Sequence, residues 1–340
     1  MAHPGERSGR LKILIVAPAW VGDMVMAHCL VRVLRSAHPD CEIHMLAPPA
    51  VEPLAQRMPG VATSHVFPLA HGELALNKRR AVAREMRGHE FAQAIVLPNS
   101  FKSALVPFWA RIPRRTGWSG EVRFGVLNDR RVLRKSHLPL MIERFMALGL
   151  ESGQMLDKPY PLPQLQADAA NAASLVSQHD LDCSAGVSVI CPGAEFGPSK
   201  RWPAEHFAAV ARHAVGLGRQ VWLIGSPNDA SICGEIESLV PAGVVNLSGK
   251  TRLVDALDLI GLSDSVVTND SGLMHVACAL ERTVIAVFGS TSPDFTPPLG
   301  PRASVLREPI ECSPCFQREC PLGHQRCLRD LRPERVVEVM

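Results

Sequence analysis

The sequence has little aromatic character and no long apolar run. Aromatic residues make up 5% of the 340 residues, and Tyr160 is the single tyrosine. This scarcity argues against a surface of stacking aromatics for single-stranded nucleic acid. No stretch approaches the roughly 18 consecutive apolar residues of a membrane span. The first ten residues are polar and lack the apolar core of a secretory signal, so we expect a cytosolic protein.

The chain is too long for one ordinary domain, because single hydrophobic cores stop growing at about 250–300 residues. Hydrophobic residues account for 46% and charged residues for 20%, which is a globular composition and not that of a disordered chain. The net charge of +3 conceals an uneven distribution. Residues 1–160 contain 22 Lys and Arg against 13 Asp and Glu, whereas residues 161–340 contain 14 against 20. We therefore expect the basic half to meet an anionic partner.

Short apolar runs alternate with helical patterns along both halves. Residues 11–18 form a continuous apolar run, which is typical of a parallel strand buried on both faces. A proline-rich linker at 157–165 separates two expected doubly wound α/β domains, 1–160 and 161–340. Ligands of such sheets bind where strands end. Further strands are expected at 42–47, 91–97, 187–191, 220–225, 265–269 and 283–289, and helices at 24–37, 73–87, 167–178, 203–216 and 231–240.

The loop after the first strand contains Gly22 and Asp23. It does not match GxGxxG, so the dinucleotide fingerprint is missing. The position of Asp23 leaves two interpretations open. Its carboxylate is either the N-cap of a helix that begins at Met24 or a general base at the mouth of a cleft.

A Gly- and Pro-rich loop in the second half contains Gly193, Ser199 and Lys200. It lacks the GxxxxGK[ST] spacing of a P-loop. Backbone N–H groups and an ammonium in such a loop can bind a phosphate, and the alternative is an irregular loop with solvated charges. Gly225 and Ser226, after the next strand, either contact a nucleoside or form a plain turn.

Another strand of the second half ends at Asp270, and a helix is expected to begin at Ser271 and Gly272. The free N–H groups of its first turn, up to Leu273, form an anion site by geometry and dipole together. His275 lies one turn further along, on the same face as Ser271. Asp270 as a simple cap and His275 as a core histidine are the competing interpretations.

Polar and basic side chains also follow strands in the first half. Most such charges are solvated, but some can bind the phosphates or carboxylates of a large anionic acceptor. The candidates for acceptor binding are Gly22, Asn99, Ser100, Lys102, Arg115 and Arg123.

Six segments, taken in order, are similar to a known family. They are APAWVGDMVMA at 17–27, LPNSFKSALVPF at 97–108, RRTGWSGEVRFGVLND at 114–129, CPGAEFGPSKRWP at 191–203, VTNDSGLMHVA at 267–277 and STSPDFTPP at 290–298. The sequence resembles the ADP-heptose:lipopolysaccharide heptosyltransferases over nearly its whole length, most closely the heptosyltransferase II type.

The resemblance implies a GT-B fold, in which two Rossmann-like domains face each other across a cleft. It implies inverting, metal-independent transfer of L-glycero-D-manno-heptose from ADP-heptose to Kdo2-lipid A that already bears one heptose. Asp23 would be the general base, and Lys200 would neutralise the diphosphate. The helix start at Asp270 to Leu273, with His275, would hold ADP. Residues 1–160 would bind the acceptor and 161–340 the donor, in a monomer at the cytoplasmic face of the inner membrane.

The ten cysteines fall into two groups. Four of them crowd the segment 312–327 together with His324, and we expect either a structural zinc ion or plain reduced thiols there. A catalytic metal is not expected, because the segment lies outside the transfer motifs. The crowded four are Cys312, Cys315, Cys320 and Cys327. The scattered six, expected to be reduced and mostly buried, are Cys29, Cys41, Cys183, Cys191, Cys233 and Cys278.

Other functions stay open from the sequence. The chain is alternatively a heptosyltransferase I, another GT-B nucleotide-sugar enzyme, or a non-catalytic nucleotide-binding module. The acidic second half argues against nucleic acid as a partner. The sequence ends within 334–340, which has the pattern of a helix start, whereas GT-B enzymes usually finish with helices that cross back to the first domain. This ending indicates either a truncated form or a short tail.

Overall fold

The structure is a computed structural model that describes residues 10–68 and 73–340, so the polar N-terminus before Arg10 lies outside the described residues. The chain forms two compact units. One comprises the residues up to Ala19 together with Ala27–Pro161, and the other comprises Trp20–Met26 together with Leu162–Met340. The boundary at Pro161 falls within the proline-rich linker. The assignment of Trp20–Met26 to the second unit was not expected.

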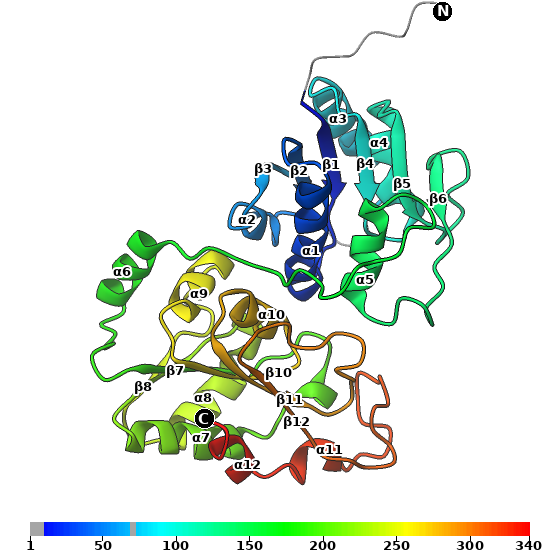
Figure 1. Cartoon of the computed structure of the whole chain (residues 1–340). Coiled ribbons are helices and arrows are strands. Elements are labelled where there is room, and N and C mark those ends of the chain that lie inside the picture. Colours follow the sequence, from blue (N-terminus) through cyan, green and yellow to red (C-terminus); the bar gives the residue numbers. More distant parts are fainter. Residues whose placement is uncertain (1–9, 69–72) are drawn as a thin grey trace, which may run out of the picture. The chain divides into compact units, whose positions relative to one another are not determined.

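The first unit is built on a six-stranded parallel sheet with the order β3-β2-β1-β4-β5-β6 (Figure 1). Its central strands are buried at every residue except the first, as the sequence predicts for strands covered on both faces. The strands are β1 (Lys12–Val16), β2 (Glu42–Ala47), β3 (Val61–Val66), β4 (Gln93–Val96), β5 (Arg114–Trp118) and β6 (Asp129–Arg131).

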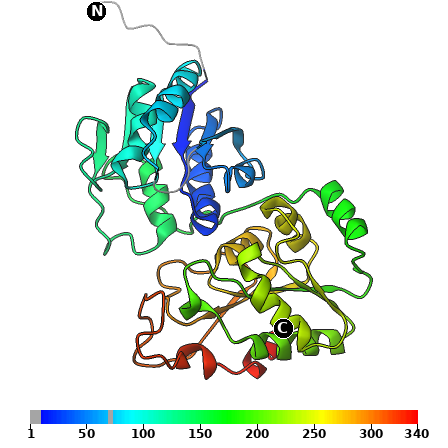
Figure 2. The same ribbon diagram turned by 180° about the vertical axis from the view of Figure 1, so that it is seen from behind.

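Helices cover both faces of this sheet. α3 and α4 pack together over one face, where Val82, Met86 and Val106 join the core of Leu14 and Leu46. Figures 1 and 2 show α1 and α5 on the opposite face. The helices and 3-10 turns are α1 (Val21–Ala37), α2 (Glu52–Ala55), α3 (Leu76–Arg87), η1 (Phe101–Ala104), α4 (Leu105–Trp109), α5 (Met141–Met146) and η2 (Ala147–Gly149).

The second unit repeats this architecture with the strand order β12-β11-β10-β7-β8-β9, again all parallel. Trp202 and Trp222 are the largest side chains fully buried in it. The indole of Trp202 donates to the carbonyl of Leu331 at 2.9 Å, which ties the C-terminal segment to the core. The strands are β7 (Val187–Cys191), β8 (Gln220–Leu223), β9 (Val244–Asn246), β10 (Ser265–Asn269), β11 (Thr283–Phe288) and β12 (Ala303–Arg307).

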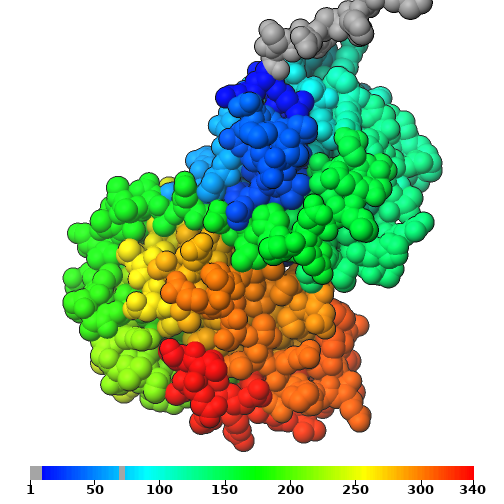
Figure 3. Space-filling model, viewed as in Figure 1, coloured from blue at the N-terminus to red at the C-terminus, as the bar shows by residue number. Residues whose placement is uncertain are grey.

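Two groups of helices lie on opposite faces of the second sheet (Figures 1 and 2). α6, α9 and α10 form one group, and α7, α8 and α12 form the other. The C-terminal residues lie at the surface of the unit, in red in Figure 3. The helices and 3-10 turns are α6 (Ala169–Gln178), η3 (Pro198–Lys200), α7 (Ala204–Gly216), η4 (Pro227–Asp229), α8 (Ala230–Ser238), α9 (Leu253–Ile260), α10 (Gly272–Ala279), α11 (Arg326–Arg329) and α12 (Glu334–Val337).

The expected strands and helices are present, but the sequence missed several others, including the inner strand β5, which begins with two arginines, and the largely buried helix α9. β3 lies at the edge of its sheet and contains no fully buried residue, so it lacks the apolar run that marks the inner strands. β9 is a short edge strand whose residues are all partly exposed. The helix expected from Met24 begins three residues earlier, at Val21. Among the described residues, no helix is both long and apolar enough to cross a membrane.

Candidate functional site

The carboxyl ends of four neighbouring strands in the second unit gather most of the candidate residues. Gly193 and Lys200 lie in the loop after β7, and Gly225 follows β8. Asp270 follows β10, and Thr291 follows β11. Since β11, β10, β7 and β8 are adjacent and parallel, their following loops meet at one edge of the sheet.

Asp270 connects two of the other loops at this edge of the sheet. Its buried carboxylate Oδ2 accepts hydrogen bonds from Lys200 Nζ and from Thr291 Oγ1, each at 2.6 Å. The Lys200 ammonium also lies over the ring of Phe196, 5.1 Å from its centroid. The sequence analysis did not identify Thr291 as a site residue. The signal that could have identified it is its position shortly after a buried strand, in the segment STSPDFTPP. The ammonium is thereby fixed beside the start of α10.

The first turn of α10 is available to a ligand in the way the sequence predicts. Ser271 is the N-cap residue, but its side chain makes no cap hydrogen bond and lies 3.2 Å from Thr268 Oγ1 instead. A Cβ atom on Gly272 would lie 2.7 Å from Cβ of Val21, so this position needs glycine. Gly272 and Leu273 therefore offer backbone N–H groups that the cap side chain leaves for an anion.

His275 is a buried, neutral imidazole. Burial, with a smaller contribution from the nearby Lys200 ammonium, lowers the pKa of His275 to about 4 against the opposing effect of Asp270. Within the described residues, His275 Nδ1 has no hydrogen-bond partner. A Cβ atom on Gly22 would lie 2.8 Å from His275 Cδ2, so the first turn of α1 packs directly on this ring. His275 can donate or accept a hydrogen bond, but it brings no positive charge at neutral pH.

Asp23 lies inside the first turn of α1 and is not its N-cap. This corrects the capping interpretation, because the helix begins two residues before Asp23. Burial raises the pKa of Asp23 to about 6, and the positive charge of Lys200 only partly offsets this effect. A carboxylate with a pKa near neutrality suits a general base, since it is ionised at pH 7 and can still accept a proton.

Four further residues predicted to bind the sugar donor make contacts that hold the loops after β7 and β8 in place. Ser199 is buried, and its hydroxyl bonds to Ser290 Oγ at 3.0 Å and to the carbonyl of Gln317, which anchors the loop after β7. Ser226 donates its backbone N–H and its hydroxyl to Asp229 Oδ2. The remaining two, Gly193 and Gly225, pack against Asp229, where a Cβ atom would lie 2.4–2.6 Å from its carboxyl group or 2.9 Å from its Cβ atom, respectively.

In the first unit, Arg123 organises the loop after β4. Its guanidinium is buried and donates to the carbonyl of Pro98 at 3.0 Å and to Asn99 Oδ1 at 3.1 Å. Ser100 and Lys102 lie at the following turn, η1, and are only partly buried. The two terminal nitrogens of Arg123 are thus engaged by the protein, an arrangement that suits positioning of this loop, and acceptor binding by Arg123 stays a prediction.

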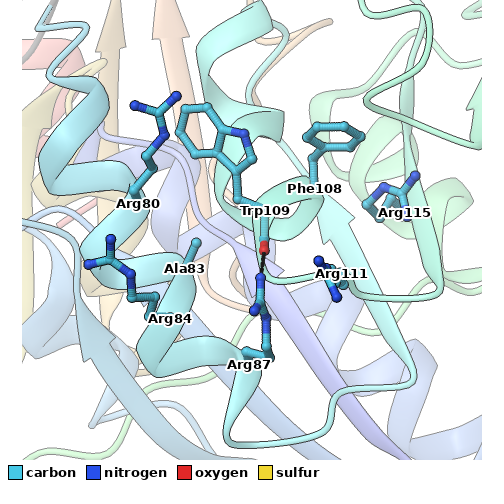
Figure 4. A pocket seen from close by; sticks show the side chains of 8 residues that line it. All are labelled: Arg80, Ala83, Arg84, Arg87, Phe108, Trp109, Arg111 and Arg115. Carbon is cyan, nitrogen blue, oxygen red and sulfur yellow. Dashed lines mark hydrogen bonds between the residues drawn. The ribbon is translucent and has the colours of Figure 1, made fainter.

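Arg115 lines a basic pocket on the face covered by α3 and α4 (Figure 4). The pocket has a volume of about 530 Å³. Arg80 lies over the ring of Trp109 and Arg115 over that of Phe108, at 4.8 and 5.6 Å from the ring centroids. The Arg115 guanidinium also donates to two backbone carbonyls, which holds it in place. The lining residues are Arg80, Ala83, Arg84, Arg87, Phe108, Trp109, Arg111 and Arg115.

The cysteine-rich segment lies beside Ser199 and Ser290 in the second unit and lines a small pocket with them. Cys312, Cys315, Cys320 and Cys327 line one small pocket together with His324. Burial, with smaller contributions from the three neighbouring thiols, raises the pKa of the Cys327 thiol to about 11. All ten cysteines are free, and five of the scattered six are buried. The sixth, Cys183, is exposed because it lies in the loop before β7.

The sequence profile of glycosyltransferase family 9 (heptosyltransferase) matches residues 79–325. The chain belongs to glycosyltransferase family 9. The matched range includes Lys200, Asp270 and His275, whereas Asp23 lies before it. Each of the two units of this family 9 protein has a Rossmann-like parallel sheet, as expected for the GT-B class.

Two curated relatives and one solved structure are similar to the chain over nearly its full length. The chain is 44% identical to lipopolysaccharide heptosyltransferase 2 of Salmonella typhimurium over 337 residues, which is 96% of this chain and 97% of that protein. The same values hold for lipopolysaccharide heptosyltransferase 2 of Escherichia coli. The solved structure of E. coli ADP-heptose lps heptosyltransferase II has 42% sequence identity and a TM-score of 0.87, and 97% of each chain is covered.

The Lys200–Asp270 pair is expected to stabilise the second unit of this family 9 protein. Lys200→Ala leaves the buried Asp270 carboxylate without its cation, so the free energy of unfolding should fall by about 3–5 kcal/mol. Lys200→Ala combined with Asp270→Asn removes the unpaired charge and should recover much of that loss. Urea-induced unfolding measures both changes.

The exposed Lys135→Ala serves as the control and should shift stability by no more than about 0.5 kcal/mol. Equal losses in the single and double variants would contradict a stabilising ion pair.

Proposed function

We propose that the chain transfers L-glycero-D-manno-heptose from ADP-heptose to the heptosylated Kdo2-lipid A inner core, as a heptosyltransferase II. Support comes from its family and from relatives named heptosyltransferase 2 that match over nearly its full length. The observation that carries the proposal is the shared location of Asp23, Lys200 and the start of α10 in the second unit. These groups supply a base, a cation and an anion-binding helix terminus.

The proposed reaction is a single displacement at the anomeric carbon of the heptose. The Asp23 carboxylate accepts the proton of the acceptor hydroxyl while that oxygen forms the new bond to the anomeric carbon. The bond from this carbon to the diphosphate oxygen breaks, and ADP leaves with the electron pair. Attack opposite the leaving group inverts the configuration. Lys200 and the N–H groups of Gly272 and Leu273 stabilise the charge on ADP without a catalytic metal.

The two units divide the substrates in this proposal. Residues 161–340 bind ADP-heptose through the loops after β7, β8 and β10, where Ser199, Gly193, Gly225 and Ser226 shape the site. Residues 1–160 bind the acceptor through Asn99, Ser100 and Lys102, and Arg123 positions Asn99. Gly22, which packs on His275, and Asp23 come from this half of the sequence but lie in the second unit. The protein acts as a monomer, for which light scattering in solution is the test.

The donor and acceptor are tested in one assay. We expect turnover of ADP-heptose, and not of other nucleotide sugars, with Kdo2-lipid A that carries the first heptose. Preference for the unheptosylated acceptor would assign heptosyltransferase I, and turnover of another donor would assign a different GT-B activity. Binding of ADP without any transfer would indicate a non-catalytic nucleotide-binding module.

Asp23→Asn should abolish transfer and retain ADP binding, because the amide cannot accept the proton and Lys200 and α10 are unchanged. Initial rates and calorimetric titration with ADP measure the two effects. In the unaltered enzyme, kcat/KM should fall as the pH drops through about 6, since protonation of Asp23 removes the base.

Asp40→Asn, which changes an exposed carboxylate, is the control and should leave the rate and its pH profile unchanged. Substantial transfer by Asp23→Asn, or a rate that stays constant down to pH 5, would remove Asp23 from the role of base.

We propose that the basic pocket on α3 and α4 binds anionic headgroups, which places the enzyme at the cytoplasmic face of the inner membrane. Arg80→Ala with Arg84→Ala removes two exposed charges from this pocket. At about 1 kcal/mol per charge, binding to vesicles of anionic lipid should weaken by about 30-fold, as measured by co-sedimentation. Arg212→Ala with Arg307→Ala, two arginines of the second unit, is the matched control. Equal binding by both double variants would contradict this surface.

We propose a structural zinc ion for the cysteine-rich segment, with reduced thiols as the competing outcome. The convergence of four thiols on one small pocket supports zinc, because tetrahedral thiolate sites are its usual structural environment. The ion would hold together a segment with little regular secondary structure and takes no part in transfer. Metal analysis of the purified protein decides, and a zinc stoichiometry near zero would establish reduced thiols.

A further inference from the structure

Three histidines outside the transfer motifs meet near the β3 edge of the first unit's sheet. His44 lies on β2, His65 on the edge strand β3, and His89 in the turn between α3 and β4. Thr63 is the register partner of His44, so His65, two residues further along, lies on the same face of the sheet. We call His44, His65 and His89 the histidine cluster.

The ring nitrogens of the histidine cluster lie at the separations that a metal ion requires. One ligand nitrogen from each of the three residues lies within 4.8 Å of the other two. His44 Nδ1 and His65 Nε2 are 2.9 Å apart. Two nitrogens at the usual Zn–N distance of about 2.0–2.1 Å in a tetrahedral site are about 3.3 Å apart. Small side-chain shifts therefore convert the cluster into a three-nitrogen ligand set.

The rings of His44 and His65 each have a carboxylate near the nitrogen that faces away from the cluster. His44 Nε2 contacts Glu42 Oε1 at 2.7 Å, so its other nitrogen, Nδ1, faces His65. His65 Nδ1 lies 3.8 Å from Glu85 Oε1, while its Nε2 faces His44. A hydrogen-bonded carboxylate orients the imidazole and makes it a better ligand, and metal-binding histidines almost always donate their other N–H to a carboxylate, a backbone carbonyl or water. The cluster thus has one hydrogen-bonded outer carboxylate, that of Glu42, as well as the ligands, and Glu85 lies farther from its ring.

The surroundings suit a bound cation that is shielded on one side and open on the other. His44 is buried, and the ring of Phe91 lies 5.0 Å from its centroid and 5.5 Å from that of His89. His65 and His89 are partly exposed, and the side chain of Glu85 is 63% exposed. An ion can therefore enter from the surface beside β3 and α3.

We propose that the histidine cluster binds one divalent transition-metal ion of the zinc type, with water as the fourth ligand. Imidazole nitrogen is a preferred ligand of Zn²⁺, and three protein ligands plus water form a common zinc environment. The bound ion links the edge strand β3 and the turn before β4 to the inner strand β2. The alternative is a metal-free cluster held by the His44–His65 hydrogen bond, which is one outcome of the test.

The experiment removes the cysteine site first. The full chain with Cys312→Ser and Cys315→Ser is treated with chelator and titrated with Zn²⁺ alone, and we expect one tight equivalent. His65→Asn or His89→Asn in that chain should weaken binding by about 100-fold or more, since each removes a ligand. His137→Asn, an exposed histidine of the same unit, is the matched control and should bind Zn²⁺ as before.

Further measurements distinguish binding at the histidine cluster from binding by cysteine thiols and from loss of folding. Co²⁺ in this chain should give ligand-field absorption without the strong thiolate-to-metal band that sulfur ligands produce. Glu42→Gln keeps all three ligands and should weaken Zn²⁺ binding by about 10–100-fold, because it removes only the carboxylate behind His44. Circular dichroism confirms that each variant is folded.

Two outcomes would overturn the proposal. No Zn²⁺ binding by the Cys312→Ser, Cys315→Ser chain would establish a metal-free, hydrogen-bonded cluster. Binding that His65→Asn and His89→Asn leave unchanged would place the ion elsewhere. Neither outcome affects the proposed heptosyl transfer, since no histidine of the cluster belongs to that site.

Discussion

Parallel strand pairing is the constraint on which the rest of this molecule depends. Every strand in each six-stranded sheet runs the same way, so the loops that follow the strands all lie at one edge. Lys200, Asp270 and Thr291 come from three such loops and meet within hydrogen-bond distance. Helices cover both faces of each sheet and bury the apolar strands. Polar groups therefore gather at the carboxyl ends of the strands.

The two carboxylates of the candidate site differ in their partners. Asp270 is paired with Lys200 and Thr291, so its charge is compensated and it fixes the ammonium beside α10. Asp23 has only the distant effect of Lys200, and burial raises the pKa of Asp23 to about 6. Lys200 interacts with both carboxylates, through an ion pair with Asp270 and through the effect of its charge on the pKa of Asp23.

The basic character of the first half has two physical origins. Arg79, Arg123 and Arg131 are buried, and their guanidinium groups donate to backbone carbonyls, so they brace loops. The arginines around the basic pocket on α3 and α4 lie closer to solvent and can meet an anionic surface. The net positive charge of the first half is therefore larger than the charge that a partner meets at its surface, because some of the arginines are buried.

Most inner strands, several of the helices between them and the loop positions of Asp23, Lys200 and Asp270 could be predicted from sequence, because most of those strands are apolar runs. The inner strand β5 could not, because it begins with Arg114 and Arg115. The edge strand β3 could not, since partial exposure removes that pattern. The sequence also identified Asp23 and His275 as candidate site residues. Only tertiary packing decided that Asp23 has a raised pKa and that His275 is neutral, because burial depends on neighbours distant in the chain. The histidine cluster likewise arises only when β2, β3 and the turn after α3 come together.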